Sequence, residues 1–189
     1  MSAIEFTWDS RDLAMWRGGK VEGALARALL MAGSSAARAM KAESSRMIRE
    51  RKRFKVAHVN RALPLSFPSS KEIMRLAWRM DVSGALVPVS AYSHRQTRKG
   101  VSVAINRGSR SLVRSAFVAT MKSGHRGVFL RKGKARLPIK EAFTTRVSDV
   151  FADGGFIPAV QVHAQGVFSA AMARLLPMEL GKLRASRRT

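Results

Sequence analysis

The chain has 189 residues, of which 46% are hydrophobic, so it is long enough and apolar enough to bury the core of one domain. Against this apolar content stand 35 Lys and Arg and only 12 Asp and Glu, which give a formal net charge of +23. An excess of this size predicts an anionic partner, and composition alone leaves open nucleic acid, an anionic membrane surface and an acidic protein ring. The sequence has no Cys, which excludes disulfides, thiolate catalysis and cysteine metal sites.

The sequence carries no targeting signal of a recognisable kind. Its first stretch, MSAIEFTWDS, has no basic region followed by an apolar one, so we expect no signal peptide. No run approaches the roughly 18–20 apolar residues that span a bilayer. We therefore expect no membrane partner, and a chain that acts in the cytoplasm where it is made or in a particle assembled there.

The chain begins with a pattern typical of a strand that leads into helices. Ile4, Phe6 and Trp8 alternate with polar residues, which predicts an N-terminal strand with one buried face. The Asp-Ser pair that follows is suited to cap a short helix over 12–17.

A long amphipathic helix is predicted over 20–53, because this stretch lacks Pro and repeats Ala, Leu and Met at three- and four-residue spacing. Only the Gly-Ser-Ser at 33–35 could interrupt it. The helix begins rich in Ala and ends as RMIRERKRFK, so we expect the basic segment around 46–63 to project from the core. Two interpretations of this end stay open, a solvated helix terminus or contact with an anionic partner. The contact candidates here are Arg46, Arg49, Arg51, Lys52 and Arg53.

The middle of the chain is predicted to form an antiparallel meander of about four strands. After a short helix in VAHVNRAL, the stretch KEIMRLAWRMD fits two interpretations, a helix from the spacing of its apolar residues and a strand from the alternation of Leu76, Trp78 and Met80. We favour a strand over 74–82, which would pair through Ser83-Gly84 with ALVPVSAY and leave Pro88 at an edge or a bulge. Alternation resumes in VSVAINRGSRS, and SAFVATM and GVFLRKG frame the turn KSGHRG as a hairpin.

The last element is predicted to be a helix, AVQVHAQGVFSAAMARLL, which Pro177 ends. The basic residues at 184–189 are expected to form a frayed tail. The order of strand, long helix, meander and C-terminal helix predicts an α+β fold in a single domain over 1–189.

The sequence offers no catalytic or metal-binding constellation. None of its four His has the spacing of a zinc pair, and we interpret all four as structural or solvent-exposed. The 12 carboxylates form no Asp-x-Asp or Glu-x-x-His arrangement, and GSRS and SGHRG complete no phosphate-binding loop. We therefore expect no enzyme activity, no cofactor and no metal.

The hairpin region over 117–143 is crowded with cations and has no carboxylate before Glu141. Two hypotheses account for it, a generic phosphate-contacting DNA-binding protein and a part of a larger assembly. A DNA-binding module usually concentrates Lys and Arg on one recognition element, whereas here they are spread over a helix end, several loops and the C-terminal tail, which favours the assembly. The candidate contacts in this region are Lys122, Arg126, Arg131, Lys132, Lys134 and Arg136.

The order of features resembles the phage minor tail protein Z family, the tail completion proteins of lambda-like long-tailed phages. The resemblance is carried by the Ala-rich helix running into RMIRERKRFKVAHVNRAL, by VAINRG, by SAFVATMKSGHRGVFLRKGKARLPIKEAF and by LLPMEL. It implies a virion protein that forms a ring at or near the head-proximal end of the tail and has no catalytic residues. Its implied partners are further copies of the chain, neighbouring neck and tail proteins and genomic DNA in the channel. The hairpin cations would then face either that DNA or acidic surfaces of adjacent rings.

Overall fold

A computed structural model describes residues 2–9, 20–68, 75–152 and 154–185. The chain has an α+β fold that divides into two compact units. Unit 2, as we call it, contains residues 2–44, 63–82 and 154–189, and unit 1 contains Met1, 45–62 and 83–153. Each unit is described by itself below.

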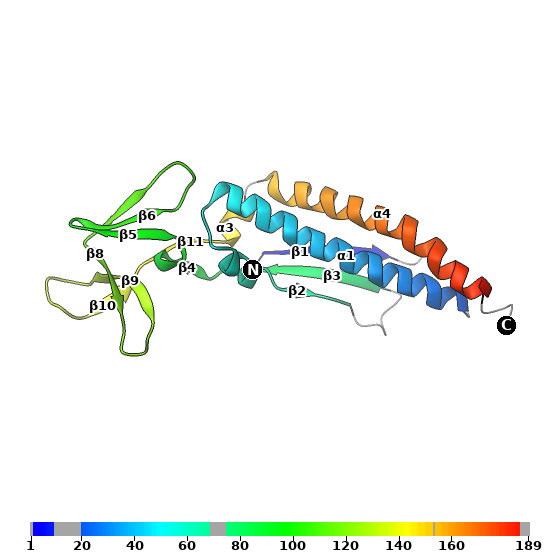
Figure 1. Ribbon diagram of the computed structural model, residues 1–189, viewed down its shortest axis with the longest axis horizontal. Helices are drawn as coiled ribbons and strands as arrows, with labels where there is room; N and C mark the ends of the chain where they lie inside the picture. The colour runs from blue at the N-terminus through cyan, green and yellow to red at the C-terminus, as the bar shows by residue number, and fades with distance from the viewer. Residues whose placement is uncertain (1, 10–19, 69–74, 153, 186–189) are drawn as a thin grey trace. The chain divides into compact units, whose positions relative to one another are not determined.

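Unit 2 is built on a three-stranded antiparallel sheet in which β3 (Arg75–Val82) lies between β1 (Ser2–Asp9) and β2 (Leu65–Ser66) (Figure 1). Along β3 the side chains of Leu76, Trp78 and Met80 are fully buried and alternate with more exposed ones. This period of two is that of a strand with one buried face, and it confirms the strand expected over 74–82.

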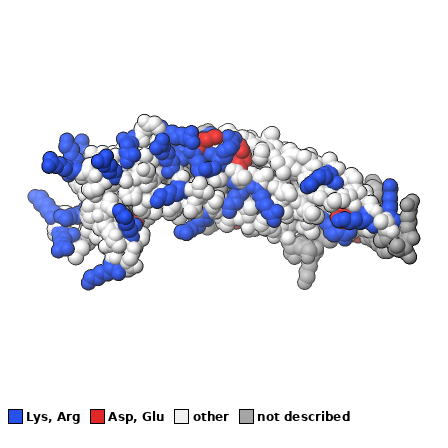
Figure 2. All heavy atoms as spheres, in the orientation of Figure 1, with Lys and Arg blue, Asp and Glu red and all other residues white. Residues whose placement is uncertain are grey.

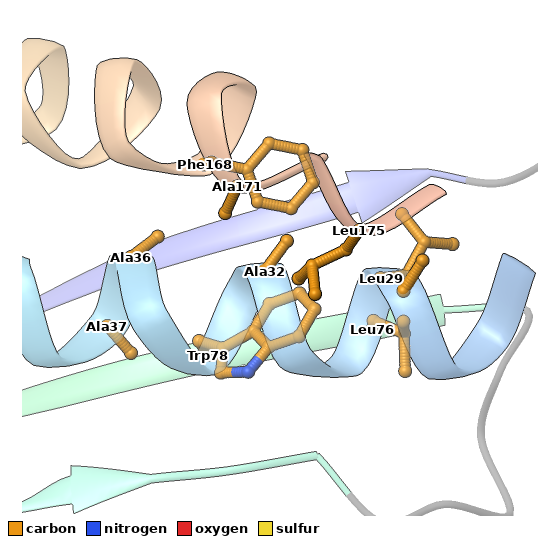
Figure 3. Packing of buried hydrophobic residues seen from close by; sticks show 10 residues of the cluster. Leu29, Ala32, Ala36, Ala37, Leu76, Trp78, Phe168, Ala171 and Leu175 are labelled. Carbon is orange, nitrogen blue, oxygen red and sulfur yellow. The ribbon is translucent and has the colours of Figure 1, made fainter. Parts of the chain in front are cut away.

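Two long helices cover the buried face of β3, namely α1 (Lys20–Arg51) and α4 (Phe156–Ala185). In Figure 3, Ala32 and Ala36 of α1 face Phe168 of α4, and Trp78 fills the space beside them. The small Ala side chains of α1 let these larger groups approach closely, and burial of the large groups supplies most of the hydrophobic stabilisation. The long N-terminal helix and the C-terminal helix predicted from the sequence are thus confirmed.

Helix α1 continues without a break through the Gly-Ser-Ser at 33–35. Gly33 is buried, and a Cβ built on it would lie 2.0 Å from a ring carbon of Trp78. Gly33 therefore provides the room for the indole and does not end the helix.

The expectation that Pro177 ends the C-terminal helix is wrong, because α4 runs through Pro177 to Ala185. A Pro inside a helix removes one backbone hydrogen bond and costs about 3 kcal/mol or more. Here the buried face of α4 continues on both sides of Pro177, through Leu175 and Glu179, while Pro177 itself is exposed. Packing on α1 offsets the local cost. Arg184 and Ala185, expected in a frayed tail, are helical, and 186–189 lie outside the described residues.

Unit 1 contains three small antiparallel sheets. One has the order β5-β6-β7, with β5 at Ser93–Thr97, β6 at Gly100–Ala104 and β7 at Ser111–Arg114. A second has the order β10-β9-β8, with β8 at Ala116–Thr120, β9 at Arg126–Arg131 and β10 at Ile139–Glu141. The third pairs β4 (Leu86–Pro88) with β11 (Phe143–Arg146). The short helices η2 (Val89–Ala91) and α3 (Ser148–Phe151) complete this part of the unit.

The hairpin predicted around KSGHRG is confirmed as β8 and β9, in which Phe117 lies directly opposite Phe129. The single meander of about four strands is wrong, because the strands separate into the sheets just described. The chain passes from the first sheet to the second at Ser115, which takes a left-handed φ of 58° between β7 and β8.

The predicted pairing of the 74–82 strand with ALVPVSAY is also wrong. Strand β3 has β1 and β2 as its neighbours, so neither of its edges is left for β4. Pro88 lies in β4, whose described partner is β11 alone, as expected for a Pro at a sheet edge.

The basic end of α1 belongs to the core of unit 1, so the expectation that 46–63 projects from the core is wrong. Ile48, Phe54 and Val59 are buried, the last of them on α2 (Val56–Ala62). The ring of Phe54 lies 5.1 Å from that of Tyr92, and Arg53 N–H donates to the carbonyl oxygen of Ile105 at 2.8 Å. Few apolar residues anchor this segment, and these three are buried although Val56 is exposed.

Among the predicted features on the N-terminal side, the short helix over 12–17 lies outside the described residues. Trp78 is a core residue.

Candidate polyanion interface

The excess positive charge is concentrated in one of the two units. Counted over its sequence, unit 1 has 21 Lys and Arg and four Asp and Glu, so it carries 17 of the 23 formal charges. Figure 2 shows Lys and Arg atoms over the strands of this unit that Figure 1 labels β5, β6, β9 and β10. Unit 1 is therefore the unit that attracts an anion more strongly.

Five of these cations line one open groove of about 920 Å³ between the β5-β6-β7 sheet and the β8-β9-β10 sheet. No Asp or Glu lines the groove. Among the described residues, none of the ion pairs to a carboxylate involves these five side chains. The groove therefore presents uncompensated positive charge, and we call it the basic groove. Its cations are Arg98, Lys99, Arg114, Arg131 and Lys134.

The side chain of Gln96 fixes the two sheets to each other at the basic groove. Its Nε2 donates to the carbonyl oxygens of Gly100 at 3.2 Å and Ala116 at 3.4 Å, and its Oε1 accepts from Val118 N–H at 2.8 Å. The backbone adds a further link, because Ser115 N–H donates to the carbonyl oxygen of Lys99 at 3.1 Å. These bonds join β5 and β6 to β8, so the walls of the groove are held at a fixed spacing.

Close packing of the backbone shapes the same region. Gly100 has a φ of 147°, and a Cβ built on it would lie 2.1 Å from the carbonyl oxygen of Val113. Any other residue would push β6 and β7 apart, so Gly is required at this position, which pairs with Arg114 of the groove.

Arg131 is the best-anchored cation of the groove. Its guanidinium carbon lies 5.6 Å from the centre of the Phe117 ring, within the range of a cation–π contact. The Phe117 ring in turn lies 6.3 Å from that of Phe129, which is buried. Aromatic packing from the core thus positions a charge at the surface.

The structure brings together only some of the hairpin cations predicted as contacts. Arg131, at the end of β9, and Lys134, in the loop between β9 and β10, line the basic groove. Lys132 and Arg136 lie in the same exposed loop but do not line the groove. Lys122 lies in the turn between β8 and β9, and Arg126 begins β9.

The cations at the end of α1 form more contacts within the chain than the cations of the basic groove do. Arg46 pairs with Glu50 at 2.6 Å, Arg49 donates to the carbonyl oxygen of Ser45 at 3.1 Å, and Lys52 donates to Asn106 at 2.8 Å. Arg51 and Lys52 also line a smaller hollow that contains Asp149. An acidic residue beside them lowers the local potential, so this end is a weaker anion site than the basic groove. Arg53, the remaining candidate, is exposed.

Sequence reasoning missed three residues of the groove, Arg98, Lys99 and Arg114. The stretch SHRQTRKG is basic in the sequence, but its proximity to β9 depends on how two separate sheets pack. No spacing along the sequence carries that information.

The histidines do not form a metal site, because the described residues contain no group of three or more His, Cys, Asp and Glu that could hold an ion. His125 Nε2 lies 3.1 Å from a carboxylate oxygen of Glu141, and His94 Nδ1 lies 3.0 Å from the carbonyl oxygen of Tyr92. Burial, with Arg61 and Lys55 nearby, lowers the pKa of His58.

No protein-family model, curated protein or solved structure matches the chain. Among the helices of the described segments, none is both long enough and apolar enough to cross a bilayer.

Proposed function

We propose that the chain is a virion structural protein of a long-tailed phage, which completes the head-proximal end of the tail as the subunit of a ring. In this role it has no catalytic function, and it joins neck and tail proteins around the channel through which the genome passes. The protein is assembled in the host cytoplasm and then resides in the virion.

The main observation behind this proposal is that the two long packed helices and most of the positive charge lie in different units. Unit 2 has a packed core of two long helices on a sheet, whereas unit 1 has several small sheets and 17 of the 23 formal charges. A subunit of a ring around DNA needs a stable body and a surface that tolerates a polyanion, and these are the two properties found here. The sequence resemblance to tail completion proteins points the same way.

The alternative is a generic DNA-binding protein that acts on phosphates outside any particle. It is favoured by the same charge and by the basic groove, but the cations lie on strands, turns and loops and not on one helix suited to a DNA groove. The two functions differ in where the protein is found.

A deletion and complementation experiment tests the proposal. The coding sequence is removed from the phage genome that carries it, and the chain is supplied from a plasmid. We expect the deletion to lower infectious titre strongly, with unjoined heads and tails in electron micrographs, and the supplied chain to restore titre and to be present in purified particles.

The purified chain provides a second test, because a ring subunit should form closed oligomers that are visible by negative-stain microscopy on addition of tail tubes. Normal titre without the chain, or its absence from purified particles, would contradict the virion assignment. Recovery of the chain with bulk intracellular DNA and not with particles would favour the alternative.

A further inference from the structure

We propose that the basic groove of unit 1 binds the sugar-phosphate backbone of duplex DNA. The inference deepens the proposed function, on which it rests for its biological setting, by naming both the partner and the residues that hold it. Binding itself is a property of the groove and can be measured on the isolated full chain.

Phosphate is the chemistry that suits this groove. Arg98, Lys99, Arg114, Arg131 and Lys134 line it without any carboxylate, and all five are exposed. Guanidinium groups bind phosphate oxygens through two parallel hydrogen bonds, and ammonium groups bind them as point charges. Clustering five such groups costs self-repulsion, and a row of phosphates would relieve it.

The lining favours nucleic acid over an acidic protein. The core of a protein–protein interface is depleted of charged residues and enriched in aromatic ones, and Lys is rare there. In the basic groove the only large apolar residue is Phe117, which is partly buried and lies under Arg131. Protein–DNA interfaces are polar and strongly positive, and this groove has those properties.

Phe117 also indicates that the groove binds duplex DNA in preference to single-stranded DNA. Proteins that bind single strands stack successive bases on exposed aromatic rings. Phe117 is the one aromatic side chain in the groove, and the guanidinium of Arg131 already occupies a face of its ring. No stacking platform is left for unpaired bases, so the ligand is a backbone whose bases are already paired.

The groove is built to keep its shape when it binds. Gln96 links the two sheets through hydrogen bonds to Gly100, Ala116 and Val118, and the backbone bond from Ser115 to Lys99 reinforces the link. Arg114 and Arg131 lie at the ends of β7 and β9, so they lose less conformational freedom on binding than cations on free loops would. Contacts of this kind are to phosphates and carry no sequence information, so binding is independent of base sequence.

Fluorescence anisotropy with a labelled duplex of mixed sequence tests the proposal. The groove variant replaces Arg98, Lys99 and Arg114 with Gln, and the control variant replaces Lys122, Arg126 and Lys140 with Gln. The two variants remove the same charge from unit 1, and the control residues are exposed and do not line the groove. We expect the groove variant to bind about tenfold or more weakly near physiological salt, with a salt dependence reduced by about two to three released ions. The control variant should lose clearly less affinity and clearly less salt dependence.

Three results would overturn the proposal. Equal losses in the two variants would mean that binding follows net charge and has no site. Competition by polyglutamate as strong as that by duplex of the same total charge would assign the groove to an acidic protein. Tighter binding of single-stranded than of duplex DNA would assign it to unpaired strands.

Lysine acetylation on the unaltered chain tests the same site without any variant that could misfold. The duplex should protect Lys99 and Lys134 by several-fold more than Lys122 and Lys140, and uniform protection would contradict the groove. These measurements are independent of the virion assignment. A chain found in particles that fails them refutes the groove alone, and a chain that passes them but is absent from particles refutes the virion function alone.

Discussion

The replacement of Gly33 by Ala tests the packing of unit 2 at a single atom. In an exposed helix this change is stabilising, because Ala exceeds Gly in helix propensity by about 1 kcal/mol. At Gly33 the added Cβ would lie 2.0 Å from one ring carbon of Trp78 and 2.3 Å from two others. The indole is fully buried and cannot swing into solvent, so α1 and β3 must move apart.

The size of the effect follows from these two opposed contributions. Forcing an extra carbon into a packed core costs about 1–3 kcal/mol, and here the clash is with rigid ring atoms and not with a flexible chain end. The rigid clash places the cost in the upper part of that range, about 2–3 kcal/mol, so after a propensity gain of about 1 kcal/mol we expect Gly33→Ala to lower the free energy of unfolding by about 1–2 kcal/mol. Gly23 offers a matched control on the same helix, since its Cβ would meet Arg27 Nη1 at an ordinary 3.5 Å. Gly23→Ala should stabilise by about 0.5–1 kcal/mol.

Thermal melting followed by the helical circular dichroism signal measures both variants, because α1 and α4 dominate that signal. For a chain of this length 1 kcal/mol corresponds to about 2–4 °C, so the two variants should melt at least about 3–6 °C apart, with Gly33→Ala lower. If Gly33→Ala melts at or above the unaltered protein, the close contact between Gly33 and the indole is not present in solution and the reasoning fails.

Three further predictions concern single side chains. Burial raises the pKa of Tyr92 above its ordinary 10, so the absorbance of this sole tyrosine should titrate at higher pH in the folded than in the denatured chain, and folding stability should fall as pH rises through the folded pKa. Equal midpoints would contradict it. Hydrogen bonds from Lys182 and Arg27 lower the pKa of Glu179, so their stabilisation is present above about pH 4.5 and is lost below it as the carboxylate protonates. Glu179→Gln should therefore flatten the acid side of the melting-temperature profile, and an unchanged profile would refute this. Phe129→Ala should cost about 3–5 kcal/mol in unfolding experiments because Phe129 is buried beneath Phe117, and a cost below 1 kcal/mol would place that ring outside the core.

The helices and the hairpin could be predicted because their signals are local. The spacing of Ala and Leu along α1 and the Gly-containing turn before Arg126 depend only on neighbouring residues. Pro177 misled prediction because tertiary packing against α1 outweighs the local cost of a Pro within a helix. Strand partners were the weakest point, since nothing near Val82 in sequence shows that β1, about 70 residues earlier, occupies the edge of β3.

The candidate site, too, could be predicted from the sequence only in part. That the β8-β9 hairpin is cationic could be predicted from composition, and Arg131 and Lys134 do line the basic groove. The contribution of Arg98 and Arg114 to the groove could not be predicted. It depends on the left-handed turn at Ser115 and on the hydrogen bonds of Gln96 between the two sheets. A Gln in a basic stretch of the sequence gives no sign that it joins two sheets.

The distribution of the two units along the chain sets an order for folding during synthesis. Most of unit 1 is the continuous stretch 83–153, so it can form once that stretch has left the ribosome. Unit 2 needs three separate stretches, and the places of Phe168 and Leu175 over Trp78 stay empty until the last of them has been made. Until then Ala28, Ala32 and the indole have no cover from α4, and a chain that terminates early exposes this apolar surface to proteases and to other nascent chains. The core of unit 2 is therefore covered only when the chain has been translated through α4.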